Sequence, residues 1–483
     1  MLSDDPPPVR GRACLVVPGR VAPEHPARVQ LQNAGWETHV LGPETGTQEL
    51  PPEAHVREFH GDGPAERSDR VRHALAHLHR EHRFGLIAFA GTGGLGFRAV
   101  QAKRAGLAFD GVPLAVVLDG NSQRDREANQ RWPSSFADVE TDYLERFAFE
   151  NADVQCVPDD ALVAFAKRNH WHVRSDAVNV LSPALAPQPL PGTAGAPLVT
   201  LAIAHYNLGE FFPDTLATLA AQTYPNLEVI AIDDGSTDAA SSAVFEAMRA
   251  KYPQFTFLRQ ANAGIGATRN RCLELARGEF FIPMDADNLA KPDMVAKFVR
   301  AIQRDPDLAA LSCFFLAFDV GAPDLVPEAF LYALRPTGGP HALAALRNVY
   351  GDANAIFRTA ALRSVGGYET DRGTSCEDWE AFVKLVHAGH RLGVVPEHLF
   401  YYRHRPGGFS RSTNWFANHQ RVLRQFAHAG ALPPAEALAL WSALLGFHQE
   451  LDRREKAIPP RRYRAVDRAY ALLRKPFAWL KRA

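Results

Sequence analysis

The sequence predicts an α/β protein with two domains, each built around a parallel sheet, and a helical C-terminal extension. Two stretches, at 13–183 and from residue 198 onward, alternate short apolar runs with segments of helical period. Such alternation is typical of βα units around a parallel sheet. Between them, residues 183–197 contain five prolines and two glycines, which indicates a semi-rigid linker. We therefore predict domains at 1–182 and 198–411, joined by the linker 183–197, with the extension at 412–483.

Composition indicates a soluble globular protein with no general attraction for nucleic acid. Of its 483 residues, 46% are apolar and 22% are charged, and 53 Lys and Arg residues nearly balance 54 Asp and Glu residues. The five cysteines are scattered and lack metal-ligand or CxxC spacing, which favours a reduced compartment. The chain shows neither a secretory signal pattern nor an apolar run of about 18 residues, so we expect a cytoplasmic protein without a membrane-spanning helix.

The first domain is expected to contain five strands separated by helices. The strands are expected at 14–17, 38–41, 86–90, 114–118 and 154–157, and helices at 67–82, 97–105, 141–151 and 160–169. After the third strand, Gly91 to Gly96 match the pattern GxGxxG at the start of a helix, where backbone N–H groups can hold a pyrophosphate. No acid ends the next strand at the usual spacing of about 20 residues. We favour a glycine-rich turn, with dinucleotide binding as the alternative.

In the second domain, an acidic turn follows a strongly apolar run. Strands are expected at 198–204, 227–232, 255–258 and from residue 280, with helices at 211–222, 239–251 and 266–276. Asp285 and Asp287 come after the last of these strands. Carboxylates at strand ends lie where open α/β sheets bind ligands, and two acids one residue apart can share a hard cation with a diphosphate. The alternative is a polar turn that closes the strand.

Two further acidic pairs stand at the ends of predicted elements. Asp233 and Asp234 close the second strand of this domain, where an acid can accept hydrogen bonds from a base or a ribose. Glu377 and Asp378 open an amphipathic helix, and acids in that position ordinarily cap the helix. Trp379 follows, and it fits the core as well as it fits a stacking contact with a sugar.

Several motifs follow one another in a fixed order along the second domain. They lie in the segments AIAHYNLGEFFPDTLATLAAQTYPNLEVIAIDDGSTD and NAGIGATRNRCLELARGEFFIPMDADN. With this order and spacing, the stretch of roughly 198–411 resembles a family 2 glycosyltransferase of GT-A fold.

The first domain carries looser motifs, among them VPGR, FGLIAFAGTGGLG, VPLAVVLDG and YLERFAFENADVQCVPDDAL. With these it resembles the N-terminal Rossmann-like half of GT-B glycosyltransferases. In that fold the nucleotide sugar is held mainly by a second Rossmann-like half, and no such half follows here. The first domain is therefore interpreted as an acceptor-side or structural module.

The resemblance to family 2 implies a role for each matching residue. Asp378 would be the general base, Glu377 would orient the site, and Trp379 would contact the acceptor. Two departures from the family pattern are Asn288, where many relatives have another acid, and Ala204, where some present a hydroxyl. The implied donor-binding residues are Asp233, Asp234, Arg269, Asp285 and Tyr206, and the implied ligands of a Mg²⁺ or Mn²⁺ ion are Asp285, Asp287 and His404.

The reaction implied is transfer of a sugar from a nucleotide-sugar donor, with a UDP-sugar favoured, to a hydroxyl of a glycan or glycolipid acceptor. A single displacement would invert the anomeric centre. Processive relatives carry transmembrane helices and a QxxRW segment, and this sequence has neither, so transfer of one or a few residues is expected. Surface polysaccharide or glycolipid synthesis is the implied setting. The alternatives are a nucleotidyltransferase and a non-catalytic scaffold that binds nucleotide or glycan.

The last stretch of the chain is basic. Residues 453–483 hold eleven Lys or Arg against two acids, interleaved with aromatic and aliphatic residues. This pattern suits an anionic membrane interface, although Pro476 interrupts any long helix. The alternatives are a solvated helix packed on the domain and a disordered tail.

Overall fold

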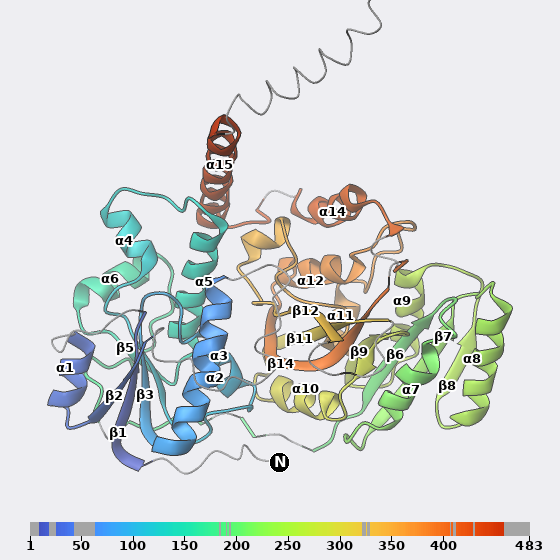
Figure 1. The fold of residues 1–483 in the computed structure, drawn as a ribbon, viewed down its shortest axis with the longest axis horizontal. Coiled ribbons are helices and arrows are strands. Elements are labelled where there is room, and N and C mark those ends of the chain that lie inside the picture. Colours follow the sequence, from blue (N-terminus) through green and yellow to red (C-terminus); the bar gives the residue numbers. More distant parts are fainter. Residues whose placement is uncertain are drawn as a thin grey trace, which may run out of the picture.

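The first of the two sheets is parallel throughout, with the strand order β2-β1-β3-β4-β5. The computed structural model describes residues 9–18, 26–42, 63–182, 185–189, 191–192, 195–320, 325, 329–405, 407–408, 412–427 and 430–457. Helices cover both faces of this sheet (Figure 1). The predicted α/β class is confirmed, and the strand order is that of flavodoxin-like doubly wound sheets. The elements are β1 (Val9–Val16), α1 (Pro26–Asn33), β2 (Glu37–Leu41), α2 (Pro64–His82), β3 (Phe84–Ala90), α3 (Phe97–Arg104), β4 (Leu114–Val117), α4 (Ser122–Ala128), α5 (Phe136–Asn151), β5 (Val154–Cys156) and α6 (Asp160–Arg168).

The glycine-rich loop after β3 has its backbone N–H groups occupied by carboxylates of the protein itself. Gly93 N donates to Glu145 Oε1 at 2.6 Å, and Gly91 N donates to Asp119 Oδ1 at 3.2 Å. Glu145 also accepts from Ser122 N at 2.8 Å. Two of the amides that would receive a pyrophosphate are therefore bound to acids, which supports the interpretation of a structural turn.

The second sheet has nine strands, in the order β10-β14-β11-β13-β9-β6-β7-β8, with β12 paired to β11. Strands β9, β6, β7 and β8 are parallel, whereas β13 runs antiparallel to both β9 and β11. The elements are β6 (Val199–His205), α7 (Phe212–Ala220), β7 (Leu227–Asp233), α8 (Ala239–Lys251), β8 (Thr256–Arg259), α9 (Ile265–Leu275), β9 (Phe280–Asp285), β10 (Leu289–Ala290), α10 (Met294–Gln303), β11 (Leu308–Asp319), β12 (Phe330–Leu334), the 3₁₀ helix η3 (His341–Ala345), β13 (Ile356–Arg358), α11 (Thr359–Ser364), α12 (Glu377–His387) and β14 (Arg391–His404).

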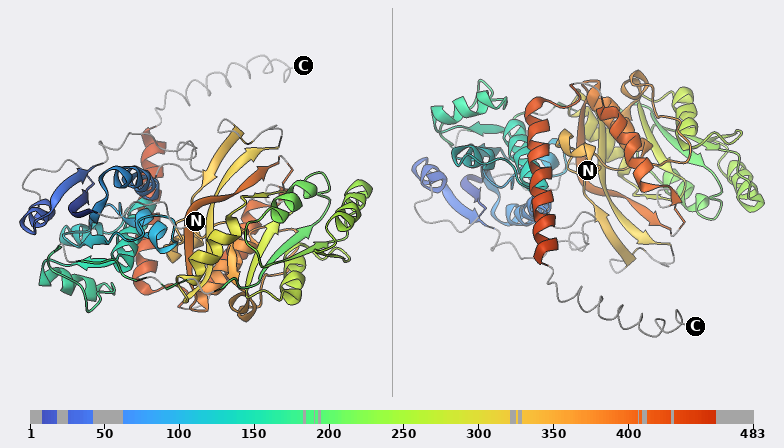
Figure 2. Two further views of the ribbon diagram at one scale, coloured as in Figure 1. Left: turned by 90° about the horizontal axis from the view of Figure 1, so that it is seen from below. Right: turned by 90° about the horizontal axis from the view of Figure 1, so that it is seen from above.

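Three helical segments complete the described chain, namely α14 (Trp415–Leu423), the 3₁₀ helix η4 (Arg424–Phe426) and α15 (Pro434–Ala457). α14 lies near α12, and α15 lies against α5 of the first domain (Figures 1 and 2). Most of the basic stretch predicted to contact a membrane, residues 458–483, lies outside the described residues. Within the described parts of the chain, no helix is both long and apolar enough to cross a bilayer.

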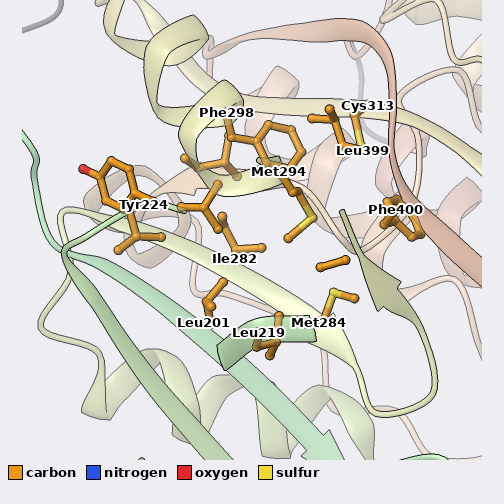
Figure 3. Packing of buried hydrophobic residues seen from close by; sticks show 14 of the residues in the cluster. Leu201, Leu219, Tyr224, Ile282, Met284, Met294, Phe298, Cys313, Leu399 and Phe400 are labelled. Atoms are coloured by element: carbon orange, nitrogen blue, oxygen red, sulfur yellow. The ribbon is translucent and has the colours of Figure 1, made fainter. Parts of the chain in front are cut away.

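The central strands of the second sheet are held by a core between the sheet and α10. Met294 and Phe298, one turn apart on α10, are fully buried against Ile282 of β9 and Leu399 of β14 (Figure 3). Burying a large apolar side chain stabilises a fold by roughly 1.5–3 kcal/mol. This packing fixes β9, whose last residue is Asp285.

The two sheets belong to one body, because a buried arginine joins them. Arg98 of α3 is fully buried and donates to the backbone carbonyls of Arg335 at 2.8 Å and Pro336 at 2.9 Å, beyond β12. Gln101, one turn on, donates to the carbonyl of Thr337 at 3.1 Å. The first domain thus holds the start of a segment that goes on to line the cavity described below.

We expect Arg98→Met to lower the free energy of unfolding by about 3 kcal/mol, because it removes a buried donor and leaves two carbonyls without a partner. Denaturant unfolding would measure the change. Arg249→Met is the control, since the side chains of Arg249 and its ion-pair partner Glu246 are 63% and 55% exposed. A surface pair contributes at most about 1 kcal/mol. Equal losses in the two variants would contradict the role given to Arg98.

Candidate active site

A cavity of about 580 Å³ lies beyond the carboxyl ends of β6 and β9. Its walls come from β9 and the turn after it, from the segment that leads to β13, from the start of α12, from the end of β14 and from α14. Charged side chains gather here from segments far apart in the sequence. They are Arg269, Asp285, Asp287, Arg347, Asp352, Glu377, Asp378, Arg403 and Arg405.

Arg269 of α9 joins two of the acidic groups that the sequence singled out. Its Nη1 donates to Glu377 Oε1 at 2.5 Å and its Nη2 donates to Asp285 Oδ1 at 2.7 Å, with only 4% of the side chain exposed. Burial acts to lower the pKa of Arg269, but the Glu377 and Asp285 carboxylates outweigh it and raise the pKa, so the guanidinium stays charged. Arg269 thereby links the end of β9 to the start of α12 across the cavity.

Asp287 is fixed by the end of β14. Arg405 Nε donates to Asp287 Oδ2 at 2.7 Å, and Arg403 Nε donates to the Asp287 carbonyl at 2.9 Å. Asn288 departs from the family pattern, and its amide links the turn to β14. The amide nitrogen donates to Asp285 Oδ2 at 3.2 Å, and the amide oxygen accepts from Arg403 N at 3.0 Å. Burial, with the nearby Asp285, raises the pKa of Asp287, while Arg405 opposes the rise.

The acidic turn fits a hard divalent cation, but the third predicted ligand, His404, does not line the cavity. Mg²⁺ is usually held by one or two carboxylates, with waters and substrate phosphates completing its shell. Asp285 and Asp287 both face the cavity and meet that requirement. His404 ends β14 opposite Asp319 and is not among the cavity residues. Across the described ranges, no three His, Cys, Asp or Glu side chains are grouped as a metal site.

Asp378 lies at the first turn of α12, on the cavity wall. Its Oδ1 accepts from Trp379 N at 2.7 Å, whereas Glu377 is bound to Arg269, so the pair does more than cap the helix. The residue before the helix, Cys376, has a left-handed φ of 72°, a conformation unfavourable for a non-glycine residue. Burial raises the pKa of Asp378 to about 7; Glu377 adds to the rise and Arg269 opposes it.

Asp352 is a cavity residue that sequence reasoning passed over. Its Oδ1 accepts from Asn354 N at 3.0 Å, and Asn354 Oδ1 accepts from Asp285 N at 3.0 Å. Burial, with Asp285 and Asp378 nearby, raises the pKa of Asp352 well above its usual value. Asp352 therefore lies between the acidic turn and α12.

A second hollow of about 510 Å³ adjoins the cavity and shares Ala204, Leu208, Ile265 and Arg405 with it. Tyr206, whose side chain is half-exposed, and Asp234 line this hollow. The Asp234 carboxylate accepts from Ala263 N and Gly264 N, both at 2.8 Å, and so shapes the loop before α9.

Asp233, which was predicted to bind the donor, lines neither space. Asp233 is fully buried. Its Oδ1 lies 3.0 Å from His205 Nδ1 and its Oδ2 lies 3.1 Å from Arg259 Nε, so it links the ends of β6, β7 and β8.

The two tryptophans that line the cavity differ in exposure. Trp379 is 4% exposed and its indole N–H donates to the carbonyl of Ala344 at 3.0 Å, so most of its side chain packs in the core. Trp415 is 69% exposed and lines the cavity from α14. The sequence predicts that Trp415 lies in the helical extension beyond the domain. A single aromatic residue at a helix start carries no pattern that predicts contact with the cavity.

Carboxylates at the end of a central parallel strand face a second acidic pair at a helix start, which is the arrangement expected of the predicted GT-A-type α/β domain. Residues 200–366 match the family model of Glycosyl transferase family 2. The predicted resemblance to this family is confirmed.

Relatives match over part of their length. The putative glycosyltransferase EpsH of Bacillus subtilis is 37% identical over 112 residues, which is 23% of this chain and 32% of that protein. The chondroitin synthase of Escherichia coli is 32% identical over 115 residues, which is 24% of this chain and 17% of that protein. The matches to EpsH and to an Escherichia coli glycosyltransferase, YibD, span about a third of those proteins.

Two solved structures are similar at low identity. The mannosyltransferase PcManGT of Pyrobaculum calidifontis, in complex with GDP-Man and Mn²⁺, is 24% identical, with a TM-score of 0.40, over 60% of this chain and 86% of that one. S. aureus TarS 1–349, in complex with UDP-GlcNAc, is 21% identical, with a TM-score of 0.40, over 51% of this chain and 71% of that one.

Proposed function

We propose that the chain is an inverting, metal-dependent glycosyltransferase that moves a sugar from a nucleotide-sugar donor, with a UDP-sugar favoured, to an acceptor hydroxyl. The observation that carries the proposal is that one cavity brings together Asp285 at the end of β9, Asp287 just after it and Asp378 at the start of α12. Asp285 and Asp287 suit the binding of a cation and a diphosphate, and Asp378 suits the role of a general base.

Separate groups of residues would bind the diphosphate and the base of the donor. Asp285 and Asp287 would hold the cation, and Arg403 and Arg405, which both donate to Asp287, would add positive charge for the phosphate oxygens. A bound Mg²⁺ or Mn²⁺ ion supplies neutralisation of the charge that develops on the leaving diphosphate. Tyr206 and the loop shaped by Asp234 offer a place for the base in the adjoining hollow.

Asp378 takes the proton of the acceptor hydroxyl as that oxygen attacks the anomeric carbon. Glu377 acts on this step through Arg269, which holds the start of α12 against β9. A single displacement of this kind inverts the anomeric centre, because the hydroxyl attacks from the face opposite the departing diphosphate. Trp415 offers an exposed ring to the acceptor at the cavity wall.

The setting proposed is synthesis of a surface polysaccharide or a glycolipid in the cytoplasm, and the relative named as a chondroitin synthase supports a glycan product. A screen of UDP-, GDP- and dTDP-sugars for release of free nucleoside diphosphate would identify the donor. A nucleotidyltransferase would instead release pyrophosphate when given a nucleoside triphosphate and a sugar 1-phosphate. Binding without any release would show a non-catalytic scaffold.

UDP is expected to raise the thermal unfolding midpoint in the presence of Mn²⁺ and to lose most of that effect with EDTA. Asp287→Asn is expected to abolish the Mn²⁺-dependent part, because a carboxylate is removed from the cation site. Asp307→Asn is the matched control, since the Asp307 side chain is 79% exposed on the surface. If neither UDP nor another nucleoside diphosphate stabilised the protein in a metal-dependent way, the donor site proposed here would be wrong.

A further inference from the structure

The two C-terminal helices carry an unusual share of the exposed apolar surface. Among the described residues, fifteen large apolar side chains are exposed, and eight of them lie within the short stretch 415–451. Isolated exposed apolar residues are ordinary, but a concentration marks an interaction surface. We define the C-terminal apolar face by Trp415, Phe416, Leu438, Trp441 and Leu445.

α15 presents this face to solvent because its opposite side is anchored. Leu440 and Ala443 are buried against the body, and Glu436 accepts from Ala342 N at 3.3 Å. Leu438, Trp441 and Leu445 follow at intervals of three and four residues and are 44%, 68% and 58% exposed. That spacing places them on one side of a helix. α15 is therefore apolar on both its inner and its outer sides, which is typical of a helix with a second partner.

α14 and α15 lie on the same side of the molecule. Both lie toward the top of Figure 1, and both lie in front when the molecule is seen from above (Figure 2). Trp415 belongs to this face and also lines the active-site cavity. The apolar face therefore reaches the wall of the site.

The positive charge of the sequence that follows α15 favours an anionic lipid surface as the partner. Residues 453–483, which begin at the end of α15, hold eleven basic residues and two acids. Apolar and aromatic residues beside a cluster of Lys and Arg suit the boundary of a bilayer that contains anionic lipids. A second copy docked on the same face would add a second segment of the same charge, and that repulsion opposes self-association.

We propose that the C-terminal apolar face binds an anionic lipid surface. The binding itself does not depend on the reaction at the cavity. Joined to the proposed function, it brings the cavity wall at Trp415 to the membrane and favours an acceptor that is carried on lipid.

Flotation of the full chain with vesicles of phosphatidylcholine and about 30% phosphatidylglycerol tests the proposal. We expect binding that weakens strongly between about 0.1 M and 1 M salt, and that falls about tenfold or more in the double variant Trp441→Ala/Leu445→Ala. Val29→Ala is the control, because Val29 is exposed on α1 at the far end of the first domain. Thermal shift with UDP and Mn²⁺ in the same variants reports on the donor site separately.

Tryptophan emission gives a second measurement with a milder substitution. Brominated lipids are expected to quench part of the emission of the unmodified chain, and Trp441→Phe is expected to remove much of that quenching. Absence of flotation with anionic vesicles would overturn the proposal. So would equal losses in the Val29 control, or a lipid-independent dimer that the double variant converts to a monomer, since that result would make a second copy the partner.

Discussion

Asp378→Asn is expected to lower kcat for sugar transfer by about 10²- to 10⁴-fold, the usual contribution of a general base. The amide matches the carboxylate in shape but cannot take the acceptor proton. Binding of UDP with Mn²⁺ should change little, because the acids of the turn after β9 remain. Transfer by the Asp307→Asn control should equal that of the unmodified chain. Substantial transfer by Asp378→Asn would show that another group is the base.

The pH dependence of kcat/KM gives a second measurement of the same assignment. A base works in its unprotonated form, and burial with the Glu377 charge nearby raises the pKa of Asp378 to about 7. The unprotonated fraction therefore falls as the pH falls below neutrality, and kcat/KM should drop about tenfold for each further pH unit. Residual activity of Asp378→Asn should lack this limb. A limb near pH 4 in the unmodified chain would indicate a base whose pKa is not raised by burial.

The sequence could predict those parts of the site that depend on strand ends and helix starts. Asp285 and Asp287 end an apolar run, and Glu377 and Asp378 open an amphipathic helix. Carboxyl ends of parallel strands share one edge of a sheet, so side chains that follow such strands meet there. The family pattern then supplied Arg269, whose contacts with both acid groups depend on the tertiary fold.

Residues that reach the site through antiparallel strands or side-chain direction could not be predicted in this way. Asp352 lies in a turn before β13, and its nearness to Asp285 follows from β13 pairing antiparallel with β9. Trp379 and Trp415 both stand at helix starts, and only the packed structure shows that the first is almost wholly buried and the second exposed. Arg98 resembles an exposed basic residue in the sequence, because its partners are 237 and 238 positions away.

Arg269→Met is expected to be the most damaging single change to stability at the site. It leaves the carboxylates of Glu377 and Asp285 buried or half-buried without their shared cation, and loss of one partner of a buried ion pair costs about 3–5 kcal/mol. Denaturant unfolding would measure the loss. Arg271→Met is the control on the same helix, since Arg271 donates to the neutral amide of Gln260 at 3.0 Å.

We attribute the loss of stability in Arg269→Met to unbalanced negative charge rather than to the space left by the guanidinium. A second variant separates these two causes. In Arg269→Met/Glu377→Gln, one of the two stranded carboxylates becomes neutral, so part of the stability should return although the guanidinium is still absent. Arg269→Lys should lie between the unmodified chain and Arg269→Met, because an ammonium keeps the charge but cannot reproduce both fixed donor positions. If the double variant were less stable than Arg269→Met, the link between β9 and α12 would depend on packing, and Glu377 would have no part in orienting the site through Arg269.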